Sequence, residues 1–171
     1  MIVLKLIFSI FFSFLLVGPS GQVDVETLKA IWVERFTRFV EWPESMDIDI
    51  FRIQVIGDKE LAQSFENVFQ SYNIKGKSVL VYSTSDSYNK NFNPHVVYVT
   101  GKNVLDEVTK DVADGPVLVI TDIKDGADKG AMISIFVKDS KIKFEINERA
   151  MSGSPLYVNY RLKQAASRIV N

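Results

Sequence analysis

Apolar and polar residues follow two different patterns between residues 130 and 147. Nearly every residue of 131–137 is apolar, which is typical of a β-strand that is covered on both faces. In residues 141–147 apolar and polar residues alternate, which is typical of a strand with one buried and one exposed face. Residues 138–141 connect the two strands, and Asp139 and Ser140 among them supply side-chain acceptors that stabilise a turn without glycine. The stretch is therefore expected to form a β-hairpin.

Two other segments carry apolar residues at the three- and four-residue spacing of a helix face. The first covers residues 25–42, where Asp24 is a suitable N-cap. Pro43 is expected to end this helix, because a proline disfavours helical geometry in the residue before it. The second covers residues 157–170 and predicts a C-terminal helix that docks back onto the sheet.

Between these segments the chain alternates between predicted strands and predicted helices. Strands are predicted at residues 51–56, 78–82, 95–100 and 117–120, and helices at residues 59–72 and 104–108. This order predicts a single α/β domain with a mixed sheet of about five to six strands flanked by helices. The closing hairpin and the C-terminal helix complete the predicted fold.

The first 21 residues have the pattern of a secretory signal peptide. Lys5 precedes an apolar run over residues 6–17, and small residues suited to cleavage follow at positions 18–21. The run is shorter than the roughly 20 residues that a membrane span needs, so a retained anchor is the less favoured alternative. We therefore expect residues 1–21 to be a cleaved signal peptide and residues 22–171 to form an exported domain.

The composition of the chain argues against several kinds of binding partner and excludes cysteine chemistry. The chain is 47% hydrophobic and carries a net charge of -1. A nucleic-acid partner is disfavoured because neutralising phosphates requires a basic patch, and an anionic membrane is disfavoured for the same reason. The chain has no cysteine, which excludes disulfides, thiolate nucleophiles and cysteine metal sites.

The residues that could carry catalysis are few. His95 is the only histidine, and no serine elbow partners it, so a structural or surface role is favoured. Asp122, Asp125 and Asp128 are spaced by three residues, whereas a calcium loop uses alternate residues, so a solvated acidic turn is favoured. We expect no enzymatic activity, no cofactor and no metal site.

Small polar residues follow three of the predicted strands. Asp58, Thr100 and Asp122 would gather at one edge if these strands run parallel, and α/β sheets bind ligands at that edge. Turn and capping roles are the alternative, and Asp58 is suited to cap the helix at residues 59–72.

The end of the first predicted helix is a candidate docking surface. Arg38, Phe39 and Trp42 lie there, and Arg and Trp are residue types that anchor protein interfaces. A solvated charged face is the alternative. Trp42, beside Pro43, would also suit a lid over the core.

Four blocks of the sequence resemble the YfiR family of bacterial envelope proteins and occur in the family's order. Residues 130–133 (GAMI) and 142–147 (IKFEIN) resemble the family's closing signature, GGMINF followed by a turn and RFEIN. Three further blocks resemble the end of the family's first helix, its first strand and its Cys-His-Val-Leu-Phe-Ile strand: RFVEWP at 38–43, FRIQVIGD at 51–58 and HVVYV at 95–99.

The resemblance implies a non-catalytic periplasmic regulator. Characterised members bind the periplasmic sensor domain of an inner-membrane diguanylate cyclase and hold it inactive. An outer-membrane lipoprotein can sequester the repressor, so that envelope stress raises cyclic di-GMP and favours biofilm. Members are also described as dimers, which makes a homodimer an expectation here.

The match to the closing signature adds two candidate contact residues. Glu145 and Asn147 lie on the polar face of the hairpin and are expected to touch a partner, with capping of the next turn as the alternative for Asn147. Gln54 and Pro94 stand where the family often has cysteines, so redox regulation is not expected. The resulting prediction is an exported regulator that inhibits an inner-membrane signalling protein by stoichiometric binding, with a periplasmic small-ligand sensor as the alternative.

Overall fold

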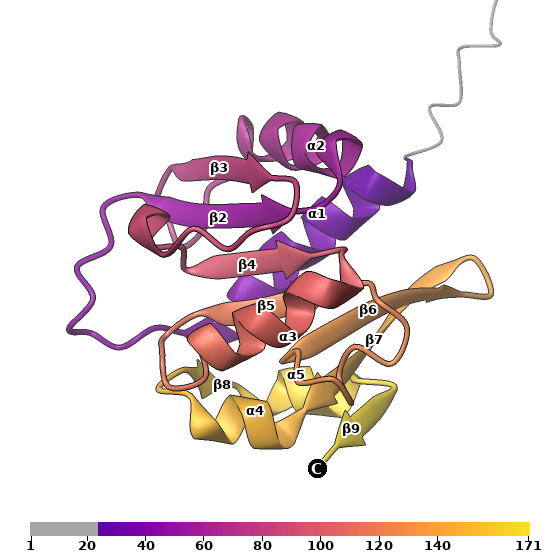
Figure 1. Cartoon of the computed structure of the whole chain (residues 1–171). Helices are drawn as coiled ribbons and strands as arrows, with labels where there is room; N and C mark the ends of the chain where they lie inside the picture. Colours follow the sequence, from indigo (N-terminus) through magenta and orange to yellow (C-terminus); the bar gives the residue numbers. More distant parts are fainter. Residues whose placement is uncertain (1–23) are drawn as a thin grey trace, which may run out of the picture.

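The computed structural model describes residues 24–171, and a seven-stranded mixed β-sheet lies at its centre (Figure 1). The predicted signal peptide, residues 1–21, lies outside the described residues. The helices are α1 (Val25–Thr37), α2 (Lys59–Phe69), α3 (Lys102–Asp111), α4 (Glu148–Gly153) and α5 (Tyr160–Ala165), and a 3₁₀ turn covers Lys90–Phe92. The strands are β1 (Val40–Glu41), β2 (Phe51–Ile56), β3 (Val79–Thr84), β4 (Val96–Val99), β5 (Leu118–Thr121), β6 (Ile133–Lys138), β7 (Lys141–Asn147), β8 (Tyr157–Val158) and β9 (Arg168–Val170). The predicted α/β fold with a mixed, helix-flanked sheet is confirmed.

The strands of the main sheet follow the order β3-β2-β4-β5-β6-β7-β9. The first five of these run parallel to one another, and β7 is antiparallel to β6. The chain passes from β2 to β3 on one side and then crosses to β4 on the other side of β2. The direction of winding therefore reverses between β2 and β4. The carboxyl ends of β2, β4 and β5 lie along one edge, where sheets of this kind bind ligands.

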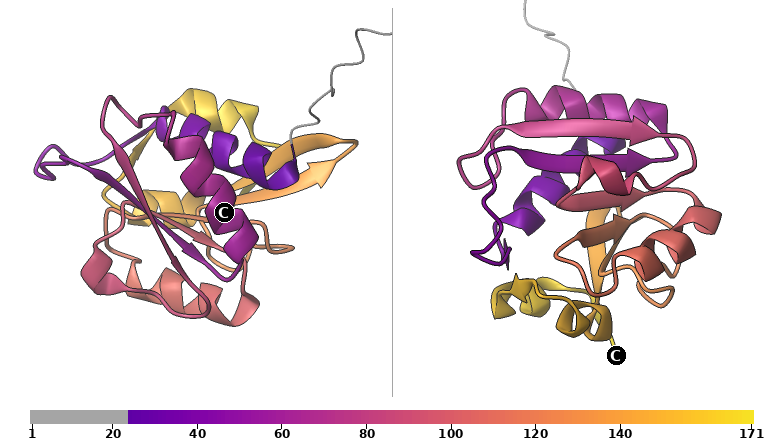
Figure 2. Two further views of the ribbon diagram at one scale, coloured as in Figure 1. Left: turned by 90° about the horizontal axis from the view of Figure 1, so that it is seen from above. Right: turned by 60° about the vertical axis from the view of Figure 1, so that its left-hand side comes forward.

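Helices cover both faces of the sheet (Figure 2, left). α1 and α2 lie on one face, over a core that includes Phe36, Phe65 and Phe144. α3 lies on the opposite face, over a smaller core that includes Leu105 and Val119. Every residue of β4 and β5 is buried, as their uninterrupted apolar sequences predict for strands covered on both faces.

α1 begins as predicted but ends at Thr37, before the predicted end at residue 42. Asp24 is the N-cap, because its carboxylate accepts a hydrogen bond of 2.7 Å from the backbone N–H of Thr27. At the other end, the Thr37 hydroxyl donates to the Glu34 carbonyl at 2.6 Å. The chain then forms β1, which pairs antiparallel with β8. The helix therefore ends before Pro43, because residues 40 and 41 pair with a distant strand.

The predicted hairpin is confirmed, and it projects beyond the other strands (Figures 1 and 2). β5 pairs with β6 only as far as Ser134, whereas β6 pairs with β7 along its whole length. Asp139 and Ser140 form the turn with φ angles of 51° and 56°. Positive φ at both positions is typical of the two-residue turns that match the twist of paired strands. The turn is therefore defined by backbone geometry that is unfavourable for residues other than glycine, asparagine and aspartate.

The C-terminal helix predicted for residues 157–170 is confirmed only over α5, Tyr160–Ala165, because β8 precedes it and β9 follows it. Asn159 starts α5 by accepting a hydrogen bond of 2.9 Å from the backbone N–H of Arg161. β9 then joins the main sheet parallel to β7, with Ile169 opposite Ile146. The sheet thus has seven strands, more than the five or six predicted. Pairing with distant strands outweighs the local helical spacing of this segment.

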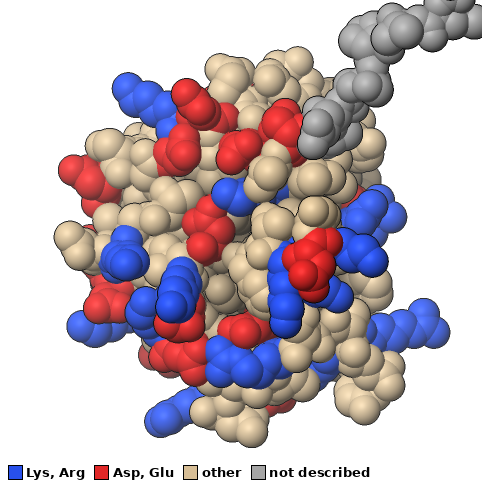
Figure 3. All heavy atoms as spheres, turned by 90° about the vertical axis from the view of Figure 1, so that its right-hand side faces the viewer, with Lys and Arg blue, Asp and Glu red and all other residues tan. Residues whose placement is uncertain are grey.

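Charged residues of both signs are interleaved on the face shown in Figure 3. Lys and Arg do not gather there into the single-sign patch that binding to phosphates requires. Within residues 24–171 no helix combines the length and the apolar character needed to cross a membrane.

Candidate functional site

An apolar groove lies between α1, β7 and α5 and has a volume of about 330 Å³. Six of its lining side chains are aromatic or aliphatic, and three are arginines: Trp32, Phe36, Phe39, Phe144, Leu162 and Ala165, with Arg35, Arg38 and Arg161. A concave apolar surface with a few charged groups is the general form of a binding site in proteins.

The floor of the groove is an aromatic cluster from α1 and β7. Trp32 and Phe36 are four residues apart, so they lie on the same face of α1. The ring centroid of Phe144, on β7, lies 5.9 Å from that of Trp32 and 4.9 Å from that of Phe36. Phe36 and Phe144 are buried, whereas Trp32 is partly exposed. The cluster therefore gives the groove a rigid base and leaves the Trp32 ring available for contact.

Two of the three arginines are held by residues of α1. The Arg35 guanidinium lies 5.3 Å from the centroid of the Trp32 ring, within range of a cation–π interaction. Arg38 donates a hydrogen bond of 2.8 Å from Nε to Oε1 of Glu34, whose side chain is largely buried. This hydrogen bond and the negative charge of Glu34 raise the pKa of Arg38. Among the described residues, no Asp or Glu lines the groove.

The three residues predicted as a docking surface at the end of α1 separate in the structure. Arg38 and Phe39 line the groove, whereas Trp42 is not among its lining residues. The Trp42 ring packs edge-on against Phe51, with centroids 4.8 Å apart. Its Nε1 is buried and has no hydrogen-bond partner within residues 24–171. Trp42 thus covers the core at the start of β2, which matches the alternative role considered for it.

Glu145 and Asn147 both hold the C-terminal region in place. Glu145 accepts a hydrogen bond of 2.6 Å from Nη2 of Arg168, on β9. Arg168 also donates to Asp128, in the loop before β6, and this bond lowers the pKa of Asp128. Asn147 accepts a hydrogen bond of 2.8 Å from the backbone N–H of Ala150 and donates one of 2.8 Å to the Ala127 carbonyl. Asn147 is therefore the N-cap of α4, and only 9% of it is exposed.

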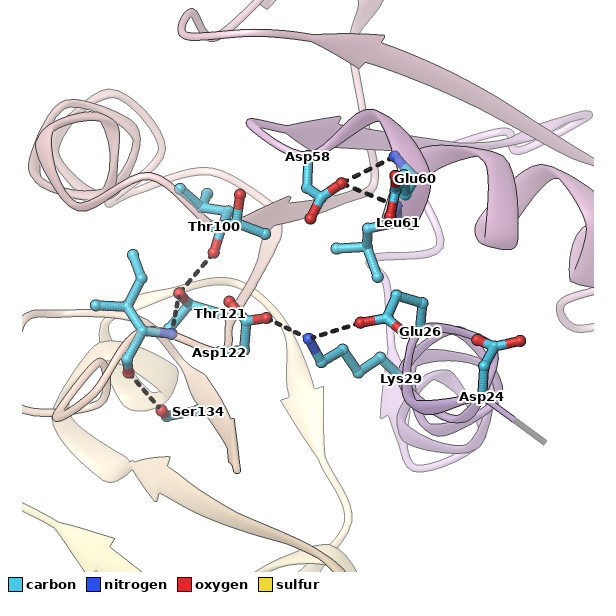
Figure 4. A network of polar contacts seen from close by, with 12 residues as sticks. Asp24, Glu26, Lys29, Asp58, Glu60, Leu61, Thr100, Thr121, Asp122 and Ser134 are labelled. Atoms are coloured by element: carbon cyan, nitrogen blue, oxygen red, sulfur yellow. Dashed lines mark hydrogen bonds and ion pairs between the residues drawn. The ribbon is translucent and has the colours of Figure 1, made fainter. Parts of the chain in front are cut away.

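The strand order brings Asp58 and Thr100 to the same edge of the sheet, on either side of the point where the winding reverses (Figure 4). Asp58 caps α2 by accepting hydrogen bonds of 2.8 and 3.2 Å from the backbone N–H groups of Glu60 and Leu61. Thr100 donates from its hydroxyl to the Ile56 carbonyl at 3.2 Å. A Cβ atom on Gly57, whose φ is +114°, would lie 2.2 Å from Oγ1 of Thr100. The Thr100 side chain therefore lies directly against Gly57 at this edge.

Asp122, the third residue of this edge, is bound to α1. Its Oδ2 lies 2.7 Å from Nζ of Lys29, and Glu26 lies 3.9 Å from the same nitrogen (Figure 4). Tyr98, on the neighbouring β4, is fully buried, and its hydroxyl lacks a hydrogen-bond partner in the described part of the chain. Burial and the nearby charge of Asp122 raise the pKa of Tyr98. The hydroxyl therefore keeps its proton and lies buried beside the Asp122 side chain.

His95 has a structural role at the start of β4. Its Nδ1 accepts a hydrogen bond of 2.9 Å from the backbone N–H of Arg52, and its ring centroid lies 4.8 Å from that of Phe51. Burial and the charge of Arg52 lower the pKa of His95 to about 4, so the ring is neutral near pH 7. Asp122 and Asp128 of the acidic turn pair with two different basic residues. In the described range, 24–171, no cluster of His, Asp and Glu is arranged to hold a metal ion.

Comparison with known proteins places the chain in a family. Residues 26–167, which run from the first turn of α1 to the loop before β9, match the YfiR/HmsC-like family. The chain belongs to the YfiR/HmsC-like family. None of the curated proteins matches the chain significantly. YfiR/HmsC-like proteins are regulatory and non-catalytic, and they are periplasmic.

The groove of this YfiR/HmsC-like protein was only partly predictable. Sequence reasoning identified Arg38 and Phe39 and missed Trp32, Phe144 and Arg161 as groove residues. Trp32 with a nearby arginine on one helix face is the type of pair that anchors interfaces, and this signal was available in the sequence. No sequence pattern placed Arg161, because the segment that contains it was predicted as part of one long helix.

Proposed function

We propose that this YfiR/HmsC-like protein is an exported periplasmic regulator that binds an inner-membrane signalling protein and holds it inactive. The proposed target is a diguanylate cyclase or a related sensor, and the proposed mechanism is a stoichiometric protein–protein contact. Inhibition requires that the regulator bind the inactive form of the target more tightly than the active form. The observation that carries the proposal is the family match over residues 26–167. Export depends on the signal peptide predicted for residues 1–21.

The groove between α1, β7 and α5 is the proposed contact surface. It combines aromatic side chains with arginines, which are enriched among the residues that dominate binding energy in protein interfaces. Arg38 and Phe39 are the proposed contact residues from the end of α1. Trp42, Glu145 and Asn147 lie outside the groove, and a direct contact of these three residues with the partner stays a separate proposal.

The proposal is tested by capture and then by inhibition. The full chain, tagged and exported in its own host, is recovered from solubilised envelopes, and the retained proteins are identified by mass spectrometry. Purified regulator is then titrated against the captured cyclase, and activity is expected to fall until a fixed molar ratio is reached. Failure of excess regulator to inhibit any captured signalling enzyme would refute the proposal. An outer-membrane lipoprotein or a second copy of the chain would be detected in the same capture.

Variants locate the contact surface in this assay. Arg38→Ala and Phe39→Ala are expected to weaken both retention and inhibition, because each removes a side chain that lines the groove. Lys110→Ala is the matched surface control, since Lys110 is exposed on α3 and α3 lies on the opposite face of the sheet. Equal losses in all three variants would contradict the assignment of this surface.

A periplasmic small-ligand sensor is the second candidate function, and Tyr98 favours it. Its buried hydroxyl lies beside Asp122 at the edge where α/β sheets bind ligands. A ligand that binds only the folded protein raises the melting temperature, so a thermal-shift screen tests this candidate. A true ligand of this edge is expected to lose its effect on Tyr98→Phe and to keep it on Arg38→Ala. A screen without any shift would count against the sensor.

A further inference from the structure

We infer that the groove docks an acidic segment of the partner protein that carries one or two large apolar anchor residues. The anchors occupy the floor formed by Trp32, Phe36 and Phe144, and the carboxylates bind the guanidinium groups beside it. This inference rests on the proposed function and adds to it the chemistry of the partner segment.

The size and lining of the groove suit side chains of a peptide. Its volume of about 330 Å³ lies at the lower end of the roughly 300–1,000 Å³ that small-molecule sites occupy, which leaves room for a few side chains. Two exposed aromatic side chains lie near the groove residue Arg161 in the sequence: Tyr157 in β8 and Tyr160 at the start of α5 are 62% and 67% exposed. These are the most exposed large apolar side chains in residues 24–171.

The charges at the groove are of one sign. Arg35, Arg38 and Arg161 line it, and neither Arg35 nor Arg161 forms an ion pair with another described residue. Arg38 binds Glu34 through Nε, which leaves its two terminal nitrogens for an incoming acceptor. Guanidinium groups bind carboxylates through two parallel hydrogen bonds, and these are stronger than bonds between neutral groups.

The positive charge of these three arginines is local to the groove, because the chain as a whole carries a net charge of -1. A second pocket, of about 290 Å³, has Asp122, Asp125 and Glu145 among its lining residues, so the two concave surfaces differ in charge. A basic segment at the groove would place like charges together in a desolvated contact, which disfavours binding. Charge therefore selects an acidic segment over a basic one. An anionic membrane would be attracted by a broader basic surface than these three arginines provide.

The test uses purified, exported full-length protein and three fluorescein-labelled peptides of equal length. The first carries Trp and Leu in a background of Asp and Glu, the second replaces each acid by Lys, and the third replaces Trp and Leu by Ser. Binding is followed by fluorescence anisotropy at low and high salt. The first peptide is expected to bind at least about tenfold more tightly than either of the others, and more weakly at high salt.

Arginine variants locate the site of peptide binding. Arg35→Ala and Arg161→Ala are each expected to weaken binding of the acidic peptide several-fold, and Arg161→Lys to retain part of it. Arg149→Ala is the matched control, since Arg149 is an exposed arginine that lies outside the groove. Circular dichroism and melting temperature show whether each variant is folded.

Three results of the peptide assay would overturn the inference. They are no binding of the acidic peptide, equal binding of the Lys peptide, and binding that survives Arg35→Ala combined with Arg161→Ala. Binding to phosphatidylglycerol vesicles in place of the peptides would also overturn it. Peptide binding without inhibition of a signalling enzyme would refute the proposed function alone, whereas inhibition without preference for the acidic peptide would refute this inference alone.

Discussion

Acidification from pH 7 to pH 5 is expected to destabilise the protein through its single histidine. His95 is 1% exposed, and its Nδ1 accepts the backbone N–H of Arg52 only while that nitrogen is unprotonated. Protonation would break the hydrogen bond and place a positive charge in the core, near the charge of Arg52. The contact between β2 and β4 would therefore weaken.

The size of this loss of stability follows from the pKa of His95 in the folded protein and in the unfolded chain. The pKa of His95 is about 4 in the folded protein, against 6.5 for a histidine in water. Because the folded pKa is the lower one, the unfolded chain binds more protons, and stability falls as the pH drops below 6.5 and levels off below 4. The free energy of unfolding falls by about 3 kcal/mol in total, and about 2 kcal/mol of this decrease is reached by pH 5.

The assay is urea unfolding of the wild type and His95→Asn at a series of pH values. Asparagine does not titrate, and its Oδ1 can take the place of Nδ1 as acceptor for the Arg52 N–H. Between pH 7 and pH 5 the free energy of unfolding is expected to fall by about 2 kcal/mol more in the wild type than in the variant. Protonation of carboxylates affects both proteins equally and cancels in the comparison.

Two results would refute the reasoning. The first is an equal loss of stability in the wild type and in His95→Asn over this pH range. The second is a His95 pKa near 6.5 in the folded protein, measured from the imidazole proton resonances. Because the chain contains one histidine, these resonances need no assignment.

Three further predictions concern backbone geometry and the C-terminal strand. Gly57→Ala is expected to lower the free energy of unfolding, measured with urea, by at least about 2 kcal/mol, because the φ angle of Gly57 is positive and the new methyl group meets Thr100. Adding Thr100→Ala should restore part of this loss. Ser140→Gly should raise the melting temperature, with a gain of about 0.5–1 kcal/mol from relief of its positive φ, and an unchanged or lower value would contradict the turn geometry. Arg168→Ala should speed hydrogen exchange of the β9 amides, because Arg168 links β9 to Glu145 and Asp128. Global stability should change little, because these ion pairs are partly exposed. Unchanged exchange would contradict the role of the ion pairs in holding β9.

Predictions from the sequence were most reliable where a local pattern coincided with burial. The hairpin at residues 131–147, the strand at 51–56 and the caps at Asp24 and Asp58 all appear where the sequence placed them. In each case the same few neighbouring residues determine both the backbone geometry and the buried face. The four-block resemblance to the family was sufficient for the fold and for family membership.

Predictions failed where distant segments pair. β1 and β8 each have two residues and form a sheet only with one another, so neither carries a strand pattern of its own. Residues 157–170 have helical spacing, yet Ile169 pairs across the sheet with Ile146 while Leu162 packs into the core. The end of α1 and the whole C-terminal region depend on these long-range pairings.

The sequence by itself determined the α/β class, the hairpin, the absence of cysteine chemistry and the two residues at the end of α1 that belong to the groove. Only the tertiary structure decided that Arg38 and Phe39 face Phe144 and Arg161, and that Trp42 instead covers the core. The physical reason is that a residue's type and spacing specify which face of its own element is apolar. Which other elements meet that face is decided by the packing of the whole chain, since a groove between α1, β7 and α5 exists only once all three are in contact.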